Sequence, residues 1–148
     1  MKHFSLSILL VLTIVNSYGQ TKTVVKSTNK NAILGENFWV SVFYVKSDKK
    51  AQYEKFVHDI FWPGASKLTP AEQQVFRQTR VMHPENAEKD GTYAYAFVMD
   101  PVIKGADYNI ESLIKKMYGE KQGGEHYKLF QDALSGDSKA YRMIQSKD

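Results

Sequence analysis

The stretch that decides the fold is FWVSVFYVK, residues 38–46. Aromatic and β-branched residues fill it, and this composition is typical of a β-strand. Side chains alternate between the two faces of a strand, and here both faces are apolar. We therefore expect both faces to be covered in the native protein. One face consists of Phe38, Val40, Val42 and Tyr44, and the other of Trp39, Ser41, Phe43 and Val45.

An amphipathic helix is predicted directly after this strand. Its apolar stripe has helical spacing and consists of Tyr53, Phe56, Val57, Ile60 and Phe61. We expect Pro63-Gly64 to interrupt the helix, because proline lacks the N–H that a helix needs and clashes with the preceding turn.

The same pair of elements recurs later in the chain. Residues 92–99 form a second aromatic strand with two apolar faces, and residues 110–118 repeat the helical stripe. We expect Gly123-Gly124 to end this helix and a further helix to begin at Glu125.

Shorter elements complete the pattern. Thr69-Pro70-Ala71-Glu72 predicts a capped helix start, with threonine as N-cap, proline in the first turn and glutamate closing a capping box. Residues 79–83 and 140–145 indicate two further strands. The order strand, helix, strand, strand, helix, strand predicts an α+β fold of the ferredoxin-like β-α-β-β-α-β type, with a four-stranded antiparallel sheet.

Residues 37–145 resemble the dimeric α+β barrel superfamily. The resemblance lies in this element order, in the two-sided apolar strands and in Phe61-Trp62-Pro63 at the end of the first long helix. Similar groups include the antibiotic-biosynthesis monooxygenase, EthD and NIPSNAP-type proteins, and no subfamily is assigned. The resemblance implies a dimer with a pocket between sheet and helices in each protomer. It also implies that some relatives oxidise aromatic substrates without a cofactor, and that others bind or degrade haem.

A homodimer is expected from the strand pattern as well. Helices on one face of the sheet leave the other face bare, and both strand faces are apolar. Monomeric proteins rarely expose a large apolar patch. We expect two copies to meet, sheet face against sheet face, about a two-fold axis.

Residues 1–19 are predicted to be a secretory signal peptide. A basic start (Lys2, His3) precedes an apolar run of about a dozen residues, and small residues Ser17 and Gly19 stand at the expected cleavage site. The run is too short to span a bilayer. We therefore expect an exported protein, periplasmic or secreted, with no membrane attachment after cleavage and a flexible lead-in over residues 20–36.

The amino-acid composition excludes some classes of functional site. The chain has no cysteine, which excludes disulfides, thiol catalysis and thiolate metal sites. Without Lys2 the balance is 19 basic (20 − 1) against 16 acidic residues, and the lysines are scattered among acids. We expect no nucleic-acid partner, because no basic stripe with interleaved aromatics is present.

Candidate site residues come from the aromatic stripes. His126 is the candidate catalytic residue, because it lies on the apolar face of its helix and could serve as a general base or a haem ligand; the alternative is a hydrogen-bonded core histidine. The candidate ligand pocket includes His126 and five aromatic residues. The alternative for these aromatic residues is a purely structural role in the hydrophobic core and the dimer interface. These five are Trp62, Tyr95, Phe97, Tyr118 and Tyr127.

The remaining histidines give no metal site by spacing. We expect His58 to be exposed and His83 to belong to a turn, and the spacing of His, Asp and Glu does not predict metal binding.

Three functions follow as hypotheses. The first is a non-enzymatic protein that binds a small apolar or aromatic ligand and needs no cofactor. The second is a cofactor-independent monooxygenase-like enzyme with His126 as base. The third is a haem-binding protein with His126 as ligand.

Overall fold

The computed structural model describes residues 31–147. The signal peptide expected over residues 1–19 and residues 20–30 of the lead-in lie outside the described residues. No helix in the described part is both long enough and apolar enough to cross a bilayer.

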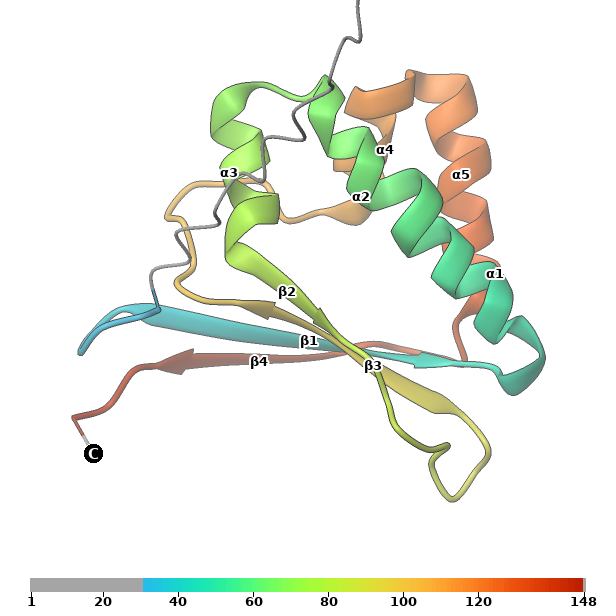
Figure 1. The fold of residues 1–148 in the computed structure, drawn as a ribbon, viewed down its shortest axis with the longest axis horizontal. Helices are drawn as coiled ribbons and strands as arrows, with labels where there is room; N and C mark the ends of the chain where they lie inside the picture. The colour runs from blue at the N-terminus through green and yellow to red at the C-terminus, as the bar shows by residue number, and fades with distance from the viewer. Residues whose placement is uncertain (1–30, 148) are drawn as a thin grey trace, which may run out of the picture.

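One antiparallel sheet forms the base of the domain (Figure 1). Its strands are β1 (Asn37–Val45), β2 (Thr79–Met82), β3 (Tyr93–Met99) and β4 (Lys139–Ile144), in the order β2-β3-β1-β4. β3 pairs antiparallel with β1 and β2, and β4 pairs antiparallel with β1. The predicted ferredoxin-like α+β fold with a four-stranded antiparallel sheet is confirmed.

All helices lie on one side of the sheet, as Figure 1 shows. The pairs Phe43–Tyr95 and Ser41–Phe97 stand opposite each other on β1 and β3 and face the helices. This settles which face of β1 meets the helices, a choice that the two apolar faces left open. The opposite face carries Phe38, Val40, Val42 and Tyr44 of β1, with Met82, Ala94, Ala96, Val98, Tyr141 and Met143 beside them.

The first helical segment is longer than predicted. After a 3₁₀ turn (Ser47–Lys49), α1 (Lys50–Lys55) continues into a π-helix (Phe56–Phe61), α2 (Trp62–Gly64) and a second 3₁₀ turn (Ala65–Lys67). The expectation that Pro63-Gly64 interrupts this helix is wrong. The Trp62 N–H bonds to the Val57 carbonyl in the π register, and Pro63 falls in the first turn of α2, where proline is tolerated.

α3 (Pro70–Gln78) begins as predicted. The Thr69 hydroxyl accepts the Glu72 backbone N–H, and the Glu72 carboxylate accepts the Thr69 N–H, which completes the capping box.

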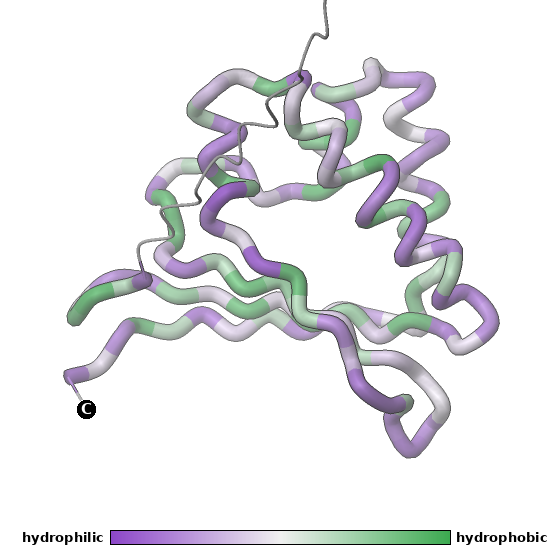
Figure 2. The backbone as a smooth tube through the Cα atoms, viewed as in Figure 1, coloured by the Kyte–Doolittle hydropathy of each residue, from purple (hydrophilic) through white to green (hydrophobic). Residues whose placement is uncertain are grey.

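The connection between β2 and β3 is mostly hydrophilic in Figure 2 and projects away from the helices.

The second helical segment breaks at a different place from the one expected. α4 (Ile110–Tyr118) ends at Gly119, whose φ of 79° suits glycine, and α5 (Glu120–Ala133) then runs through Gly123 and Gly124. The predicted break at Gly123-Gly124 is therefore wrong, because Gly123 is needed inside the helix where α5 crosses α4.

The core lies between the sheet and the helices. Val45, Tyr53, Phe56 and Ile114 are fully buried, and Phe130 of α5 packs its ring against Phe43, Tyr53 and Phe56. The predicted stripes of the two amphipathic helices thus supply the core.

Candidate ligand cavity

A small cavity lies between the sheet and the helices. Its walls include Phe43 and Phe97 from the sheet, Trp62 from α2, Phe76 from α3, and Tyr108 and Leu113 from the second half of the chain. Its free volume is about 60 Å³. That is room for a few water molecules, whereas an apolar cavity of roughly 150 Å³ takes a benzene ring.

Trp62 is one of the aromatic wall residues of the cavity. It follows the π-helix directly, and the Trp62 ring packs edge-on against Phe97 at 5.9 Å and Phe76 at 5.4 Å between centroids. Edge-to-face contacts of this kind stabilise aromatic clusters. Trp62 is half-buried, so it belongs both to the cavity and to the surface.

An open groove of about 570 Å³ adjoins the cavity on the surface. It lies between α2 and α3, and its walls include Pro63, Gln73 and Arg77. Trp62, Phe76 and Thr79 line both the groove and the cavity. The two spaces are therefore neighbours that share these three residues.

The polar side-chain groups of the lining residues are the hydroxyls of Ser41, Thr79 and Tyr108 and the indole N–H of Trp62. The Thr79 hydroxyl donates to the Val75 carbonyl at 2.7 Å, and the Tyr108 hydroxyl accepts the Ile103 N–H at 2.8 Å. Burial raises the pKa of Tyr108, so its phenol stays neutral at physiological pH. The described lining residues include no Asp, Glu, His, Lys or Arg, so neither a carboxylate nor an imidazole lines the cavity.

The structure places some of the predicted pocket residues in the cavity wall and the others elsewhere. Trp62 and Phe97 line the cavity, whereas Tyr95, Tyr118, Tyr127 and His126 do not. Tyr95 is buried against Tyr53 at 4.6 Å between centroids, and its hydroxyl donates to Glu54 at 2.6 Å. Burial and this carboxylate raise the pKa of Tyr95.

His126 lies between helices. Its ring meets the Tyr118 ring edge-on at 4.8 Å, and the Tyr118 hydroxyl donates to the Ile60 carbonyl at 2.8 Å. Tyr127 stacks on Phe130 at 5.9 Å. His126 does not line the cavity, and the cavity is far too small for a porphyrin. His126 and the cavity therefore do not form a haem site together.

Phe76 and Tyr108 were missed as cavity residues by sequence reasoning. Phe76 lies in the predicted helix after Thr69, but its direction depends on how α3 docks. Tyr108 lies in the irregular segment before α4, where no periodic pattern marks a buried residue.

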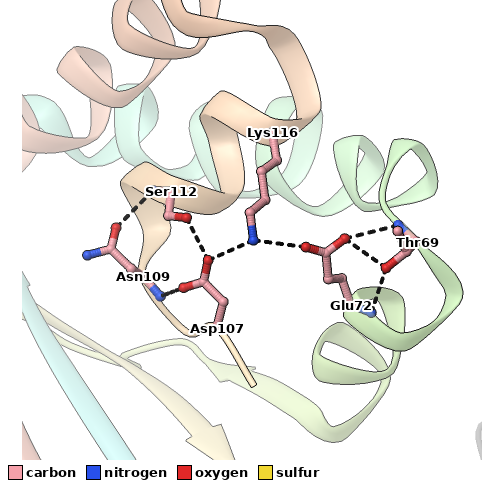
Figure 3. A network of polar contacts seen from close by, with 6 residues as sticks. All are labelled: Thr69, Glu72, Asp107, Asn109, Ser112 and Lys116. Atoms are coloured by element: carbon pink, nitrogen blue, oxygen red, sulfur yellow. Dashed lines mark hydrogen bonds and ion pairs between the residues drawn. The ribbon is translucent and has the colours of Figure 1, made fainter. Parts of the chain in front are cut away.

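A polar network fixes α3 against α4 (Figure 3). Lys116 of α4 donates to Glu72 of α3 at 2.9 Å and to Asp107 at 3.0 Å. Asp107 also accepts the Ser112 hydroxyl at 2.6 Å and the Asn109 N–H at 2.9 Å. Because α3 carries Phe76, this network helps to hold one wall of the cavity in place.

His58 and His83 are exposed, and their rings stack on each other. The ring centroids of His58 and His83 are 5.0 Å apart and their planes differ by 14°. No group of three or more His, Asp or Glu side chains suited to a metal ion occurs within residues 31–147.

No protein-family model matches the sequence, and no curated protein matches it either. Among solved structures, the chain is similar to a proposed antibiotic biosynthesis monooxygenase from Caulobacter crescentus, with 14% identity, a TM-score of 0.41, and coverage of 78% of this chain and 94% of that chain. It is also similar to a proposed antibiotic biosynthesis monooxygenase from Bordetella bronchiseptica, with 12% identity, a TM-score of 0.41, and coverage of 75% and 97%. Identities this low say nothing about activity, and the ferredoxin-like assignment rests on the strand order and register described above.

Proposed function

We propose that this protein is an exported homodimer that binds a small apolar or aromatic ligand between its sheet and its helices. The observation that carries the proposal is the cavity beside Trp62, whose walls are mostly aromatic and aliphatic and whose polar side-chain groups are three hydroxyls and the Trp62 indole N–H. Ligand sites of this type are mostly apolar, with a few polar groups that orient the ligand.

Entry of a ring requires the cavity to enlarge toward the groove. The cavity, at about 60 Å³, is smaller than a benzene ring needs. The groove behind Trp62 and Phe76 provides the additional space. Binding should therefore perturb Trp62 directly.

Binding is better supported than catalysis. A cofactor-independent monooxygenase needs a base close to its substrate, and the described cavity wall has neither a carboxylate nor an imidazole. The haem hypothesis depends on His126, which packs against Tyr118 outside the cavity.

The dimer in this proposal is supported by the bare sheet face. Met82, Tyr141 and Met143 on that face are 43%, 50% and 43% exposed. Apolar exposure of this extent in a folded domain favours an interface.

The experiment uses fluorescence. The chain has two tryptophans, so the variant Trp39→Phe reports on Trp62 alone. We expect saturable changes in its emission when toluene or phenol is added. Ser41→Leu fills the cavity and should abolish the change, whereas Ser135→Leu adds the same bulk at an exposed position and should not. A flat titration with both probes, or saturation unaffected by Ser41→Leu, would contradict the proposal.

A further inference from the structure

We propose that the ligand is a small aromatic carboxylate, whose ring occupies the cavity and whose carboxylate is bound by Arg77 in the groove. This inference rests on the proposed ligand-binding function and adds the chemical class of the ligand. It comes from the relation between the groove, the cavity and the one arginine in the groove wall.

Arg77 is held in a defined position. Its Nε–H donates to the Gln74 side-chain oxygen at 2.8 Å, and its Nη2 donates to the Pro70 carbonyl at 3.2 Å. Both acceptors are on α3, the helix that also carries Phe76. The guanidinium is therefore oriented before a ligand arrives, which reduces the entropy cost of binding.

The charge of Arg77 has no carboxylate partner within residues 31–147, since both of its acceptors are neutral. Arg80 differs: its Nη2 lies 2.8 Å from Asp100. Lys116 is likewise paired, with Glu72 and Asp107. Arg77 thus combines a fixed position with an unneutralised charge, and this combination favours an anionic partner.

The other polar donors of the groove are already used. The Ser66 hydroxyl donates to the Pro63 carbonyl at 2.8 Å, and the Gln73 side-chain amide donates to the Leu68 carbonyl at 2.9 Å. The remaining N–H groups of Arg77 are therefore the charged donors in the groove wall. A planar guanidinium binds a planar carboxylate with two parallel hydrogen bonds.

The ring of the ligand has a place next to this charge. Trp62, Phe76 and Thr79 line both the groove and the apolar cavity, and Thr79 follows Arg77 by two residues. An amphipathic molecule with a flat apolar body and one carboxylate would match both spaces together. A neutral ring would match only the cavity.

The test compares benzoate with benzamide, which have the same ring and nearly the same shape but differ in charge. Affinities are measured by calorimetry on the full chain at neutral pH. We expect benzoate to bind about tenfold more tightly, because a hydrogen bond to a charged group is stronger than a neutral one. Arg77→Gln should remove this preference, and Arg77→Lys should restore part of it.

Lys55→Gln is the matched control, since it removes one positive charge from an exposed helical residue that does not line the groove. It should keep the full preference for benzoate. Circular dichroism establishes that each variant is folded.

The outcomes separate the two proposals. Equal binding of benzoate and benzamide by the wild type would overturn the carboxylate inference and leave the ligand-binding proposal standing. A preference for benzoate that persists in Arg77→Gln would overturn the assignment to Arg77. If neither compound binds, and toluene and phenol fail as well, both proposals are wrong.

Discussion

Gly123 of α5 approaches Lys115 of α4 so closely that a side chain at Gly123 would collide with the backbone of α4. A Cβ atom added to Gly123 would lie 2.7 Å from the Lys115 Cα and 2.9 Å from the Ile114 carbonyl oxygen. At Gly124 an added Cβ would meet nothing within 4 Å. The two neighbouring glycines therefore have different roles, although the sequence presents them as one Gly-Gly pair.

Substitution by alanine should separate these roles. Gly123→Ala should lower the free energy of unfolding by about 1–3 kcal/mol, because the added methyl group forces α4 and α5 apart. Gly124→Ala should raise it by up to about 1 kcal/mol, because alanine is the better helix former. Urea denaturation of both variants gives the two values. Equal effects at the two positions would contradict the close approach of the helices.

The glycine pair and Pro63 show where local sequence reasoning fails. Glycine weakens a helix and proline interrupts one when only the local chain is considered, so breaks were expected at both places. Gly123 is retained because another helix needs the space, and Pro63 is accommodated by a π turn that begins at Phe56. The local sequence pattern shows neither the close approach of α4 to Gly123 nor the π turn that precedes Pro63. Elements set by local signals, such as the Thr69 capping box and the strands β1 and β3, were predicted correctly.

The buried hydroxyl of Tyr53 leads to a second prediction. Tyr53 has no exposed surface, and its hydroxyl has no hydrogen-bond partner among the described residues. Burial raises its pKa, so the group is neutral and unpaired. Because an unsatisfied buried polar group costs free energy, Tyr53→Phe should raise the free energy of unfolding by about 1 kcal/mol.

Tyr95→Phe is the matched comparison. It removes a hydroxyl that donates to Glu54 at 2.6 Å and should lower the free energy of unfolding by about 1 kcal/mol. Both values come from thermal or urea denaturation. A loss of stability in Tyr53→Phe as large as that in Tyr95→Phe would show that the Tyr53 hydroxyl has a partner after all.

The network between α3 and α4 predicts a dependence of stability on acid. Hydrogen bonds from Lys116 and Thr69 lower the pKa of Glu72 below its ordinary value of 4.5. Partial burial raises the pKa of Asp107, but hydrogen bonds from Ser112, Asn109 and Lys116 outweigh it and bring the pKa below 3.8. Both carboxylates therefore stabilise the fold above these values and lose that contribution as the pH falls through their folded-state pKa values.

Lys116→Met should make this acid-induced loss less steep, since the cation no longer favours the ionised carboxylates. Lys121→Met, at an exposed position outside the network, should leave the profile unchanged. Urea midpoints measured from neutral pH down to about pH 3 test both variants. Identical profiles for wild type and Lys116→Met would show that the network contributes nothing to stability.

The candidate site, like the fold, was predictable where the local sequence sets it and unpredictable where the packing of distant elements sets it. Trp62 and Phe97 were predicted as pocket residues from the number of aromatic residues in the chain, and both line the cavity. Tyr108 and Arg77 became visible only through the packing of α3 and α4 against the sheet. His126 lies on the predicted face of its helix, but that face meets α4 and Tyr118 as well as the core.

The bare sheet face provides the last prediction, that of a homodimer. Val40 lies in the middle of this face, opposite Val98 on one side and Tyr141 on the other. We expect sedimentation equilibrium to give twice the mass of one chain for the wild type. Val40→Glu places a charge in the proposed interface and should give a single chain, because an unpaired buried charge is strongly unfavourable. Ser47→Glu adds the same charge at an exposed residue beyond the end of β1 and should stay dimeric. A wild type that sediments as one chain, or a Val40→Glu variant that remains dimeric, would show that the sheet face is not the interface.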